Sequence, residues 1–488
     1  MKRPDDLFDR ESEWRSLADF LKRPGPGVQL GLVRGRRRQG KSFLLRRLAH
    51  AANGFYFQAV DGDKTQALEG FGEALGTYLG VPGGRLALAN WEAAVEALLG
   101  VRSRKGPAAV VIDEFPYLLS HSPELPSIFQ RAIDKSRDEP AAVRLVLCGS
   151  ALSVMAGLLT GAQALRGRAS LDLVVRPFDF RLSAKYWGID DVPTAFRVHA
   201  ILGGTPGYRD LLPGAPPRRV GDIERWLTAG VLNPSSAMFR EAEYLLTEER
   251  SLSDRSLYQS VLTTIANGHS SQGAISAALR REQRAIQHPL RVLEEAGFVR
   301  RTDDVLRERR PIYSIVDPIV RFHNVVTLRD IARFEDRRTT EAWADSQSRF
   351  SSHVLGPHFE DLACEFALRF ASPRTLGGRA NHVGPAIVND ARGRSQHELD
   401  VVATAIEDSG AQRVVALGEA KHTTARRTTA DLERLDRIRG IVSEKHPSAT
   451  SARVMLFAAN GFDRALVSAA AVRSDVELID LERMYRGD

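Results

Sequence analysis

The sequence lacks the features of a secreted, disulfide-bonded or membrane-spanning protein. Its 488 residues include two cysteines, Cys148 and Cys364, which excludes a disulfide framework and a cysteine zinc site. No apolar run is long enough to span a bilayer, and the first residues lack the apolar segment of a signal peptide. Internal repeats and low-complexity tracts are also absent. We therefore expect a globular cytoplasmic protein with no membrane partner.

A strong excess of charge of either sign is missing too. Lys and Arg number 68 against 61 Asp and Glu, for a net charge of +7. This modest basicity permits nucleic-acid binding without requiring it. A hydrophobic content of 43% is normal for a chain with a sizeable core, and the length predicts about three domains.

A glycine-flanked loop follows the apolar run 28–33 and precedes a helical pattern. The glycines would let backbone N–H groups turn toward phosphates, and the following helix would direct its positive dipole end at the same anion. Lys41 would reach the terminal phosphates of ATP, and the Ser42 hydroxyl would ligate Mg²⁺. The alternative is a Gly/Arg surface turn that matches by chance. The residues that match the motif G-x-x-x-x-G-K-[ST] are Gly35, Arg36, Arg37, Arg38, Gln39, Gly40, Lys41 and Ser42.

A second apolar run, 108–112, ends in two carboxylates, Asp113 and Glu114. A run of this length is typical of a buried parallel strand, whose C-terminal end is where α/β sheets bind ligands. Asp113 would hold Mg²⁺ through its water shell, and Glu114 would be the general base for the attacking water. The alternative is an ordinary strand that ends in acidic surface residues.

Four segments together resemble the archaeal-type AAA ATPases, which stand near the AAA+ and STAND groups of P-loop ATPases. They are the phosphate loop, Val111-Ile-Asp-Glu-Phe-Pro-Tyr-Leu, Gly149-Ser150, and Gly203-Gly-Thr-Pro-Gly-Tyr. The resemblance implies an ATP-driven conformational switch with a P-loop AAA+-like parallel sheet and a helical lid that holds the Gly-Gly-x-Pro segment. In such a core Ser150 would sense the γ-phosphate.

Two details of this region stay open at the level of sequence. Arg166 or Arg168 could stabilise charge in the transition state, or both could belong to a solvated surface. Trp14, in a short helix before the phosphate loop, lies either where AAA-type ATPases contact adenine or in the hydrophobic core.

Residues 251–316 have the outline of a winged helix. Helices are expected at 257–266, 272–279 and 287–296, with strands at 297–301 and 311–316. The functional interpretation is that arginines contact the phosphates of a DNA duplex. The alternative is a winged helix that only packs between domains. The arginines concerned are Arg280, Arg281, Arg284 and Arg291, with Arg307, Arg309 and Arg310 near the wing.

The C-terminal part carries a second group of acids. Glu360 lies in a predicted helix at 359–370, and Asp400 lies in a predicted strand at 398–406. Glu419 and Lys421 fall two residues apart in a predicted strand at 413–421, so they share one face that Asp400 can join. Two or three carboxylates with one lysine form a Mg²⁺ site of hard oxygen ligands.

The order Glu, Asp, Glu-x-Lys is similar to that of the PD-(D/E)xK nuclease superfamily. The similarity implies Glu360 as the helix acid, Asp400 and Glu419 as metal ligands, and Lys421 as the catalytic lysine. Leu399 stands where the family motif has proline. The alternative is a buried ion-pair network in an inactive remnant of the nuclease fold.

The predicted fold class is α/β, in four domains: an ATPase core (1–185), a helical lid (186–250), a winged helix (251–325) and a restriction-endonuclease-like α/β domain (326–488). The predicted function is an ATP-hydrolysing AAA-type ATPase that acts on DNA and carries a metal-dependent nuclease-like domain. The alternatives are a STAND-like regulatory switch or a DNA-binding regulator, each with an inactive nuclease-like scaffold. A homo-oligomer, with an ATP site completed by a neighbouring subunit, and a resting monomer both remain open.

Overall fold

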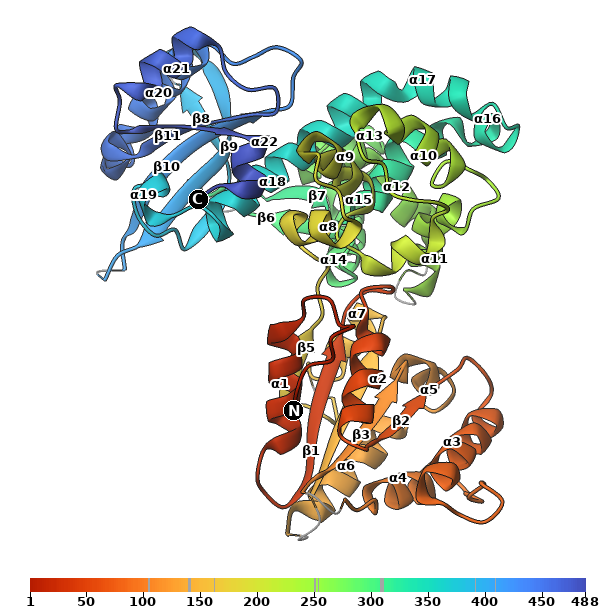
Figure 1. Ribbon diagram of the computed structural model, residues 1–488. Helices are drawn as coiled ribbons and strands as arrows, with labels where there is room; N and C mark the ends of the chain where they lie inside the picture. The colour runs from red at the N-terminus through yellow and green to blue at the C-terminus, as the bar shows by residue number, and fades with distance from the viewer. Residues whose placement is uncertain are drawn as a thin grey trace. The chain divides into compact units, whose positions relative to one another are not determined.

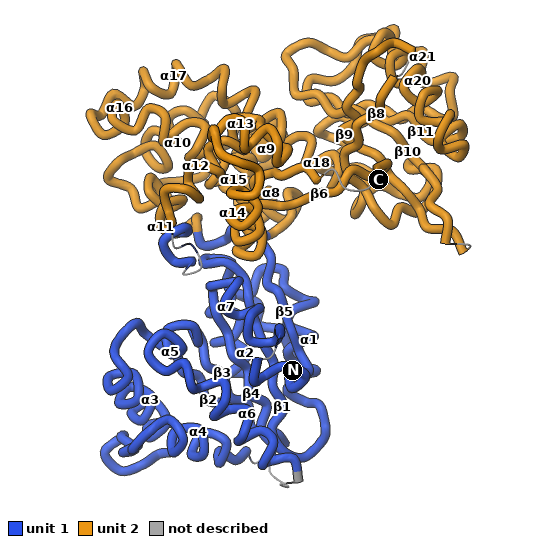
Figure 2. The backbone as a smooth tube through the Cα atoms, turned by 180° about the vertical axis from the view of Figure 1, so that it is seen from behind, with its two compact units in different colours: residues 1–177, 205–207, 245–253 blue, residues 178–204, 208–244, 254–488 orange. Residues whose placement is uncertain are grey.

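The computed structural model describes residues 1–103, 106–138, 142–161, 163–249, 252, 254–307, 311–390, 392–408 and 410–488. Contacts divide the chain into two compact units, shown in Figure 2. Unit 1 consists of Met1–Pro177, Thr205–Gly207 and Leu245–Ser253, and unit 2 contains the remainder. Across the described ranges, no helix combines the length and the apolar character needed to cross a membrane.

Unit 1 is built on a parallel five-stranded sheet in the order β2-β3-β4-β1-β5 (Figure 1). All six residues of β3 are buried, because helices cover both faces of the sheet. This confirms the α/β fold class and the parallel sheet predicted from the apolar runs. The strands are β1 (Gly27–Arg34), β2 (Phe55–Gln58), β3 (Ala108–Asp113), β4 (Ala142–Gly149) and β5 (Ala169–Val174).

The two faces of this sheet form separate hydrophobic clusters. Val111 of β3 joins one cluster, whereas its neighbours Val110 and Ile112 join the other. Trp14 is 4% exposed within the first cluster, so its side chain belongs to the core. Helices α1 (Glu11–Lys22) and α2 (Lys41–Ala51) cover the first face, and α3 (Lys64–Leu79), α4 (Trp91–Leu99), α5 (Phe115–His121) and α6 (Leu125–Lys135) cover the second.

Unit 2 begins with helices and one short hairpin. Three helices and an antiparallel hairpin follow one another in the order predicted for residues 251–316, and a bridge between Ser271 and Ile312 adds a third strand contact. Arg309 and Arg310 lie outside the described residues. The elements are α8 (Phe180–Trp187), α9 (Val192–Leu202), α10 (Ile223–Ala229), α12 (Arg255–Ala266), α13 (Gln272–Ala278), α14 (Gln283–Glu295), β6 (Val299–Thr302), β7 (Ile312–Ile315), α15 (Pro318–Phe322), α16 (Ile331–Glu335) and α17 (Thr339–Arg349). Helix α7 (Leu152–Gly157) belongs to unit 1, and α11 (Glu241–Glu248) spans the boundary between the units.

The C-terminal part of unit 2 is a mixed sheet in the order β12-β11-β10-β9-β8. Strands β8, β9 and β10 pair antiparallel, whereas β10, β11 and β12 pair parallel through helical crossovers. The elements are α18 (Gly356–Arg369), α19 (Pro373–Leu376), β8 (His382–Asp390), β9 (Ser395–Ile406), β10 (Gln412–Lys421), α20 (Thr429–Ser443), β11 (Arg453–Ala458), α21 (Arg464–Ala471), β12 (Val476–Asp480) and α22 (Leu481–Arg486).

The residues that follow β6 bind to the edge of this C-terminal sheet. The backbone N–H of Val305 donates to Pro385 O at 3.2 Å, and the Val305 side chain joins the hydrophobic cluster of the sheet. A carboxylate oxygen of Asp304 accepts the N–H of Ile387 at 2.9 Å. These contacts cover the β8 edge, which would otherwise expose unpaired backbone groups. Residues 304–305 are therefore held by the sheet.

We predict that Asp304→Ala lowers the free energy of unfolding by about 2 kcal/mol, because two backbone N–H donors lose their acceptor. Asp304 is 5% exposed and accepts from Leu306 as well as Ile387, each at 2.9 Å. Urea denaturation followed by circular dichroism measures the change. The control is Asp303→Ala, which removes only an exposed ion pair with Arg301. Equal stability of both variants would contradict the role given to Asp304.

Candidate functional site

The predicted phosphate loop lies between β1 and α2 in unit 1. Arg38 and Gly40 have positive φ angles of 64° and 87°, which turn the backbone back on itself. A Cβ atom on Gly35 would lie 2.4 Å from the backbone oxygen of the residue after β5, so only glycine fits there. The buried Lys41 donates from Nζ to Arg36 O at 2.9 Å. Its ammonium group is thus held over the loop, where a phosphate oxygen would replace that carbonyl.

The two acids at the end of β3 have different surroundings. Asp113 is fully buried and accepts a 2.8 Å hydrogen bond from the Tyr56 hydroxyl. Burial, reinforced by the Asp113 carboxylate, raises the pKa of Tyr56, so the hydroxyl stays protonated and donates. Glu114 has a φ of 53°, in the left-handed region, and accepts from Ser150 Oγ at 3.0 Å. The structure therefore brings the predicted base and the predicted sensor together, with backbone strain of the kind that clusters at functional sites.

The two candidate transition-state arginines differ in their partners. Arg168 forms an ion pair with Asp134 at 2.7 Å, and this hydrogen bond raises the pKa of the guanidinium. Arg166 is exposed and donates to Gly161 O at 2.8 Å. Of the pair, Arg166 has no carboxylate partner in the described part of the chain. Arg37 of the phosphate loop pairs with Glu248.

The Gly-Gly-Thr-Pro-Gly segment touches the phosphate loop through its last three residues. Thr205–Gly207 belong to unit 1, where Gly207 N donates to Arg38 O at 3.0 Å. A Cβ atom on Gly207 would come within 2.8 Å of the Arg38 side chain, so this backbone approach requires glycine. Sequence analysis placed the segment in the lid and did not find this contact with the loop.

In unit 2, the predicted acids of the C-terminal domain meet at one lysine. Lys421 Nζ lies 3.2 Å from Glu419 Oε1 and 3.5 Å from Asp400 Oδ2. Burial, together with the charge of Asp400, raises the pKa of Glu360 to about 8. Burial also raises the pKa of Asp400 despite the nearby lysine. The structure thus gathers all four predicted residues, with Glu360 holding a proton at neutral pH.

Two arginines that sequence analysis missed complete the surroundings of Glu419. This carboxylate is 1% exposed, and Arg434 Nη1 of α20 lies 2.5 Å from its Oε1. Arg427 Nη2 lies 3.7 Å from Oε2, too far for a hydrogen bond. Within the described ranges, Oε2 is a buried acceptor without a hydrogen bond. The sequence carries no signal for these two contacts, because several other arginines follow the same strand and none has a motif spacing.

Asp400 and Glu419 fit a divalent cation in the chemistry of their donors. Both supply hard carboxylate oxygens, and Glu419 Oε2 has no donor among the described residues. The same part of the chain contains no group of three or more His, Cys, Asp and Glu side chains arranged to hold a metal. Because Lys421 and Arg434 both contact Oε1, a metal held by Asp400 and Glu419 would compete with these cations.

Two buried histidines and a half-buried third lie beside this centre, and sequence analysis missed them. His199 Nδ1 on α9 lies 2.9 Å from His358 Nε2 on α18. The ring of Phe196 stacks on His422, which follows Lys421, with centroids 5.4 Å apart. Burial lowers the pKa of both His199 and His422 to about 4. Helix α9 thus contacts the helix of Glu360 through His199 and the residue after the Lys421 strand through Phe196.

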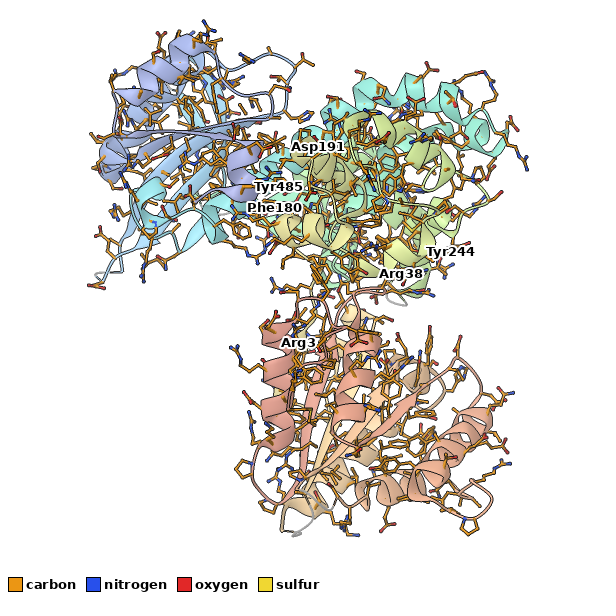
Figure 3. The ribbon with its side chains drawn as sticks, in the orientation of Figure 1. Arg3, Arg38, Phe180, Asp191, Tyr244 and Tyr485 are labelled. Carbon is orange, nitrogen blue, oxygen red and sulfur yellow. The ribbon has the colours of Figure 1, made fainter. Side chains whose placement is uncertain are left out.

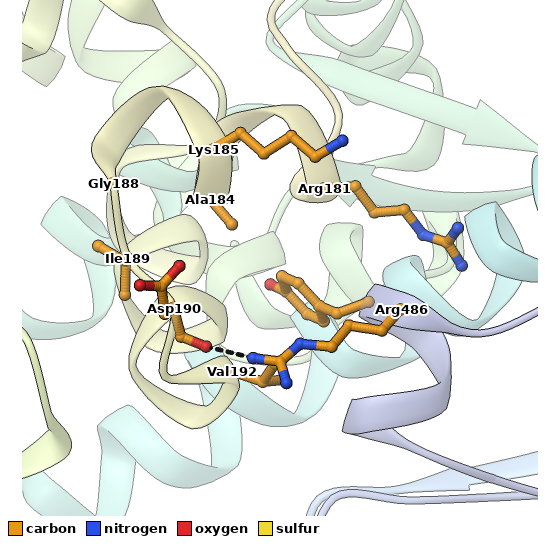
Figure 4. A pocket seen from close by; sticks show the side chains of 9 residues that line it. Arg181, Ala184, Lys185, Gly188, Ile189, Asp190, Val192 and Arg486 are labelled. Carbon is orange, nitrogen blue, oxygen red and sulfur yellow. Dashed lines mark hydrogen bonds between the residues drawn. The ribbon is translucent and has the colours of Figure 1, made fainter.

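A separate basic cavity of about 610 Å³ lies between α8 and α22 (Figure 4). Arg486 donates to Asp190 O at 2.6 Å, and Arg181 donates to Met484 O at 2.8 Å. The rings of Phe180 and Tyr485, labelled in Figure 3, pack edge to face at 4.9 Å. Since backbone carbonyls hold both guanidinium groups, these contacts join α8 to α22.

The predicted DNA-contacting arginines lie on the surface around the start of α14. Arg280, Arg281 and Arg284 are exposed, and the first two precede the helix in the described structure. Arg291, which follows Arg284 in the same helix, is also exposed, and its Nη1 lies 3.7 Å from Glu295 Oε1.

Residues 7–190 match the family of ATPase domains found predominantly in Archaea. That match and the geometry of the phosphate loop support an ATPase of the archaeal type at this end of the chain. A relative from Methanocaldococcus jannaschii, of uncharacterized function, is 23% identical over 370 residues, which cover 74% of this chain and 77% of the relative.

Solved structures are also similar. The Walker-type ATPase of Pyrococcus abyssi is 21% identical, with a TM-score of 0.47, and the match covers 66% of this chain and 97% of that one. The ORC2 protein of Aeropyrum pernix with ADPNP and ADP is 16% identical, with a TM-score of 0.41 and coverage of 70% and 97%. The ORC1 protein of the same organism, in complex with DNA, is 20% identical, with a TM-score of 0.31 and coverage of 68% and 95%.

We predict that the chain loses stability as the pH falls from 6.5 toward 4, and that His199→Asn loses less over this range. The folded state holds the pKa of His199 below its ordinary 6.5, so the unfolded state binds the extra proton. The loss in the variant should be smaller by about 1 kcal/mol or more. Urea midpoints at pH 7 and pH 5 test this, with the exposed His382→Asn as control. An equal pH dependence in all three proteins would contradict it.

Proposed function

We propose that this protein is an ATP-hydrolysing AAA-type ATPase that acts on DNA and carries a C-terminal metal-dependent nuclease-like domain. The observation that carries the proposal is the phosphate loop with Glu114 and Ser150 in hydrogen-bond contact, inside the segment that matches the archaeal ATPase domain. The cytoplasm is the compartment that the composition favours.

In ATP hydrolysis, the loop from Gly35 to Gly40 directs backbone N–H groups at the phosphates, and Lys41 neutralises their charge. Glu114 accepts the proton of the attacking water, while Ser150 holds the Glu114 carboxylate at 3.0 Å. Bound Mg²⁺ would neutralise phosphate charge, with Ser42 and Asp113 as the residues to hold it. Arg166, without a carboxylate partner in the described chain, is the better candidate to reach a nucleotide in a neighbouring subunit.

The proposal predicts that Glu114→Gln lowers the rate of ATP hydrolysis at least about 100-fold while ATP still binds, because the water loses its base. Lys41→Ala should lose ATP binding itself, because the phosphates lose their cation. Phosphate release and binding of a fluorescent ATP analogue separate the two effects. Glu124→Gln, at an exposed ion pair with Lys64, is the control. Normal turnover in Lys41→Ala would overturn the ATPase assignment.

Action on DNA is supported by the exposed arginines around α14. Arg280, Arg281 and Arg284 lie in the region expected to enter a DNA groove, next to the hairpin formed by β6 and β7. Each phosphate contact would release counterions, so DNA affinity should fall with salt.

The proposed nuclease chemistry uses the centre around Lys421. Asp400 and Glu419 would hold Mg²⁺, which supplies Lewis acidity and an activated water when bound. Lys421 orients that water or stabilises charge that develops on the phosphate. Burial lowers the pKa of Lys421, but Asp400 and Glu419 outweigh burial and raise it overall, so the ammonium stays charged.

A second candidate function is the regulatory switch with an inactive nuclease-like scaffold. The observation that favours it is the ion-pair network at Glu419, where Lys421, Arg427 and Arg434 already neutralise the carboxylate. In that case nucleotide binding alone would change the contacts of the helices in unit 2.

Cleavage of linear and circular DNA distinguishes the two functions. We predict cutting with Mg²⁺ or Mn²⁺ that Lys421→Ala reduces at least about 100-fold, because charge on the phosphate is no longer stabilised. Lys445→Ala, on the segment after α20, is the control. Absence of cutting, or cutting that Lys421→Ala retains, would favour the regulatory switch.

A further inference from the structure

We propose that Arg434 closes the metal site in the free protein and opens it by transferring its guanidinium from Glu419 to a backbone phosphate of bound DNA. The inference rests on the proposed nuclease-like function and names a positioning residue for it. Arg434 would make metal binding depend on bound DNA, so that the protein without DNA binds the metal weakly and does not cut.

The charges at Glu419 are the first argument. Glu419 faces Lys421, Arg427 and Arg434, and Arg427 is in turn paired with Asp431. With Asp400 counted, the three cations and three carboxylates balance. This group of side chains has no net negative charge to attract a divalent cation, and its three cations would repel one. Metal binding at Glu419 therefore requires that one of these three side chains moves away.

Exposure decides which cation leaves. The side chain of Arg427 is 13% exposed and is fixed by Asp431, and Lys421 is shared between two carboxylates. The Arg434 side chain is 37% exposed, and its Nη1 lies 2.5 Å from Glu419 Oε1. Arg434 can thus reach solvent by rotation of its own side chain, without unfolding of α20.

The chemistry of the guanidinium identifies what it moves to. A planar guanidinium pairs with two oxygens of a phosphodiester as well as with a carboxylate. Departure of Arg434 leaves Glu419 Oε1 contacted by Lys421 alone, next to Oε2, which has no hydrogen bond in the described structure. Glu419 would then be free of one of its competing cations and could take a metal together with Asp400.

The test measures metal binding by the full chain without nucleotide, with Mn²⁺ as the probe in isothermal titration calorimetry. Arg434→Gln should bind Mn²⁺ about tenfold more tightly than the wild type, because one competing charged hydrogen bond is removed. Arg434→Lys should fall between them. Arg437→Gln, three residues along α20 at an exposed position, should match the wild type.

A second measurement tests the phosphate contact. Anisotropy of labelled duplex DNA in EDTA gives the salt dependence of binding without cleavage. Arg434→Gln should lower the slope of log affinity against log salt by about 0.9, the value of one phosphate contact. An unchanged slope would overturn the transfer to phosphate.

The remaining outcomes separate the inference from the proposed function. The role given to Arg434 would be wrong if wild type and Arg434→Gln bound Mn²⁺ equally well while Glu419→Gln lost Mn²⁺ binding. The proposed metal site would still stand in that case. No Mn²⁺ binding in any variant would overturn both. Circular dichroism spectra and melting temperatures that match the wild type establish that each variant is folded.

Discussion

A carboxylate that is 1% exposed has to be neutralised, and the C-terminal half of the molecule is arranged around that requirement at Glu419. Strand β10 brings Lys421 to it, α20 brings Arg434, and the loop between them brings Arg427. Asp400 shares the lysine from β9. The same ion pairs are expected in an inactive domain and in a metal-dependent one, because the buried Glu419 carboxylate needs neighbouring cations in both.

Nucleotide chemistry in unit 1 depends on a different constraint, which is backbone geometry. The loop turns through positive φ angles at Arg38 and Gly40, and Glu114 adopts a third one at the end of β3. The parallel sheet holds these turns at the ends of β1 and β3, with Ser150 at the end of the intervening β4. Burial of both sheet faces makes the positions of these strand ends rigid.

Much of this could be predicted from the sequence, because the signals are local. The apolar runs 28–33 and 108–112 predicted β1 and β3 nearly in place, and the two-residue spacing of Glu419 and Lys421 placed them beside Asp400. What the sequence could not supply are contacts between distant segments: Tyr56 on Asp113, Arg434 on Glu419, and the pair of His199 with His358. None of these has a characteristic spacing, since each depends on how separate elements pack. The packing of α8 and α9 with the C-terminal elements is a further contact of this kind.

The chain passes between the units after residues 177, 204, 207, 244 and 253. Consequently no single cut in the polypeptide yields two complete units. A fragment that stops at residue 177 would lack Thr205–Gly207, and with them the backbone hydrogen bond from Gly207 to Arg38 of the phosphate loop. Separate expression of residues 1–177 would thus remove part of the support of the phosphate loop, so simple truncation does not isolate unit 1.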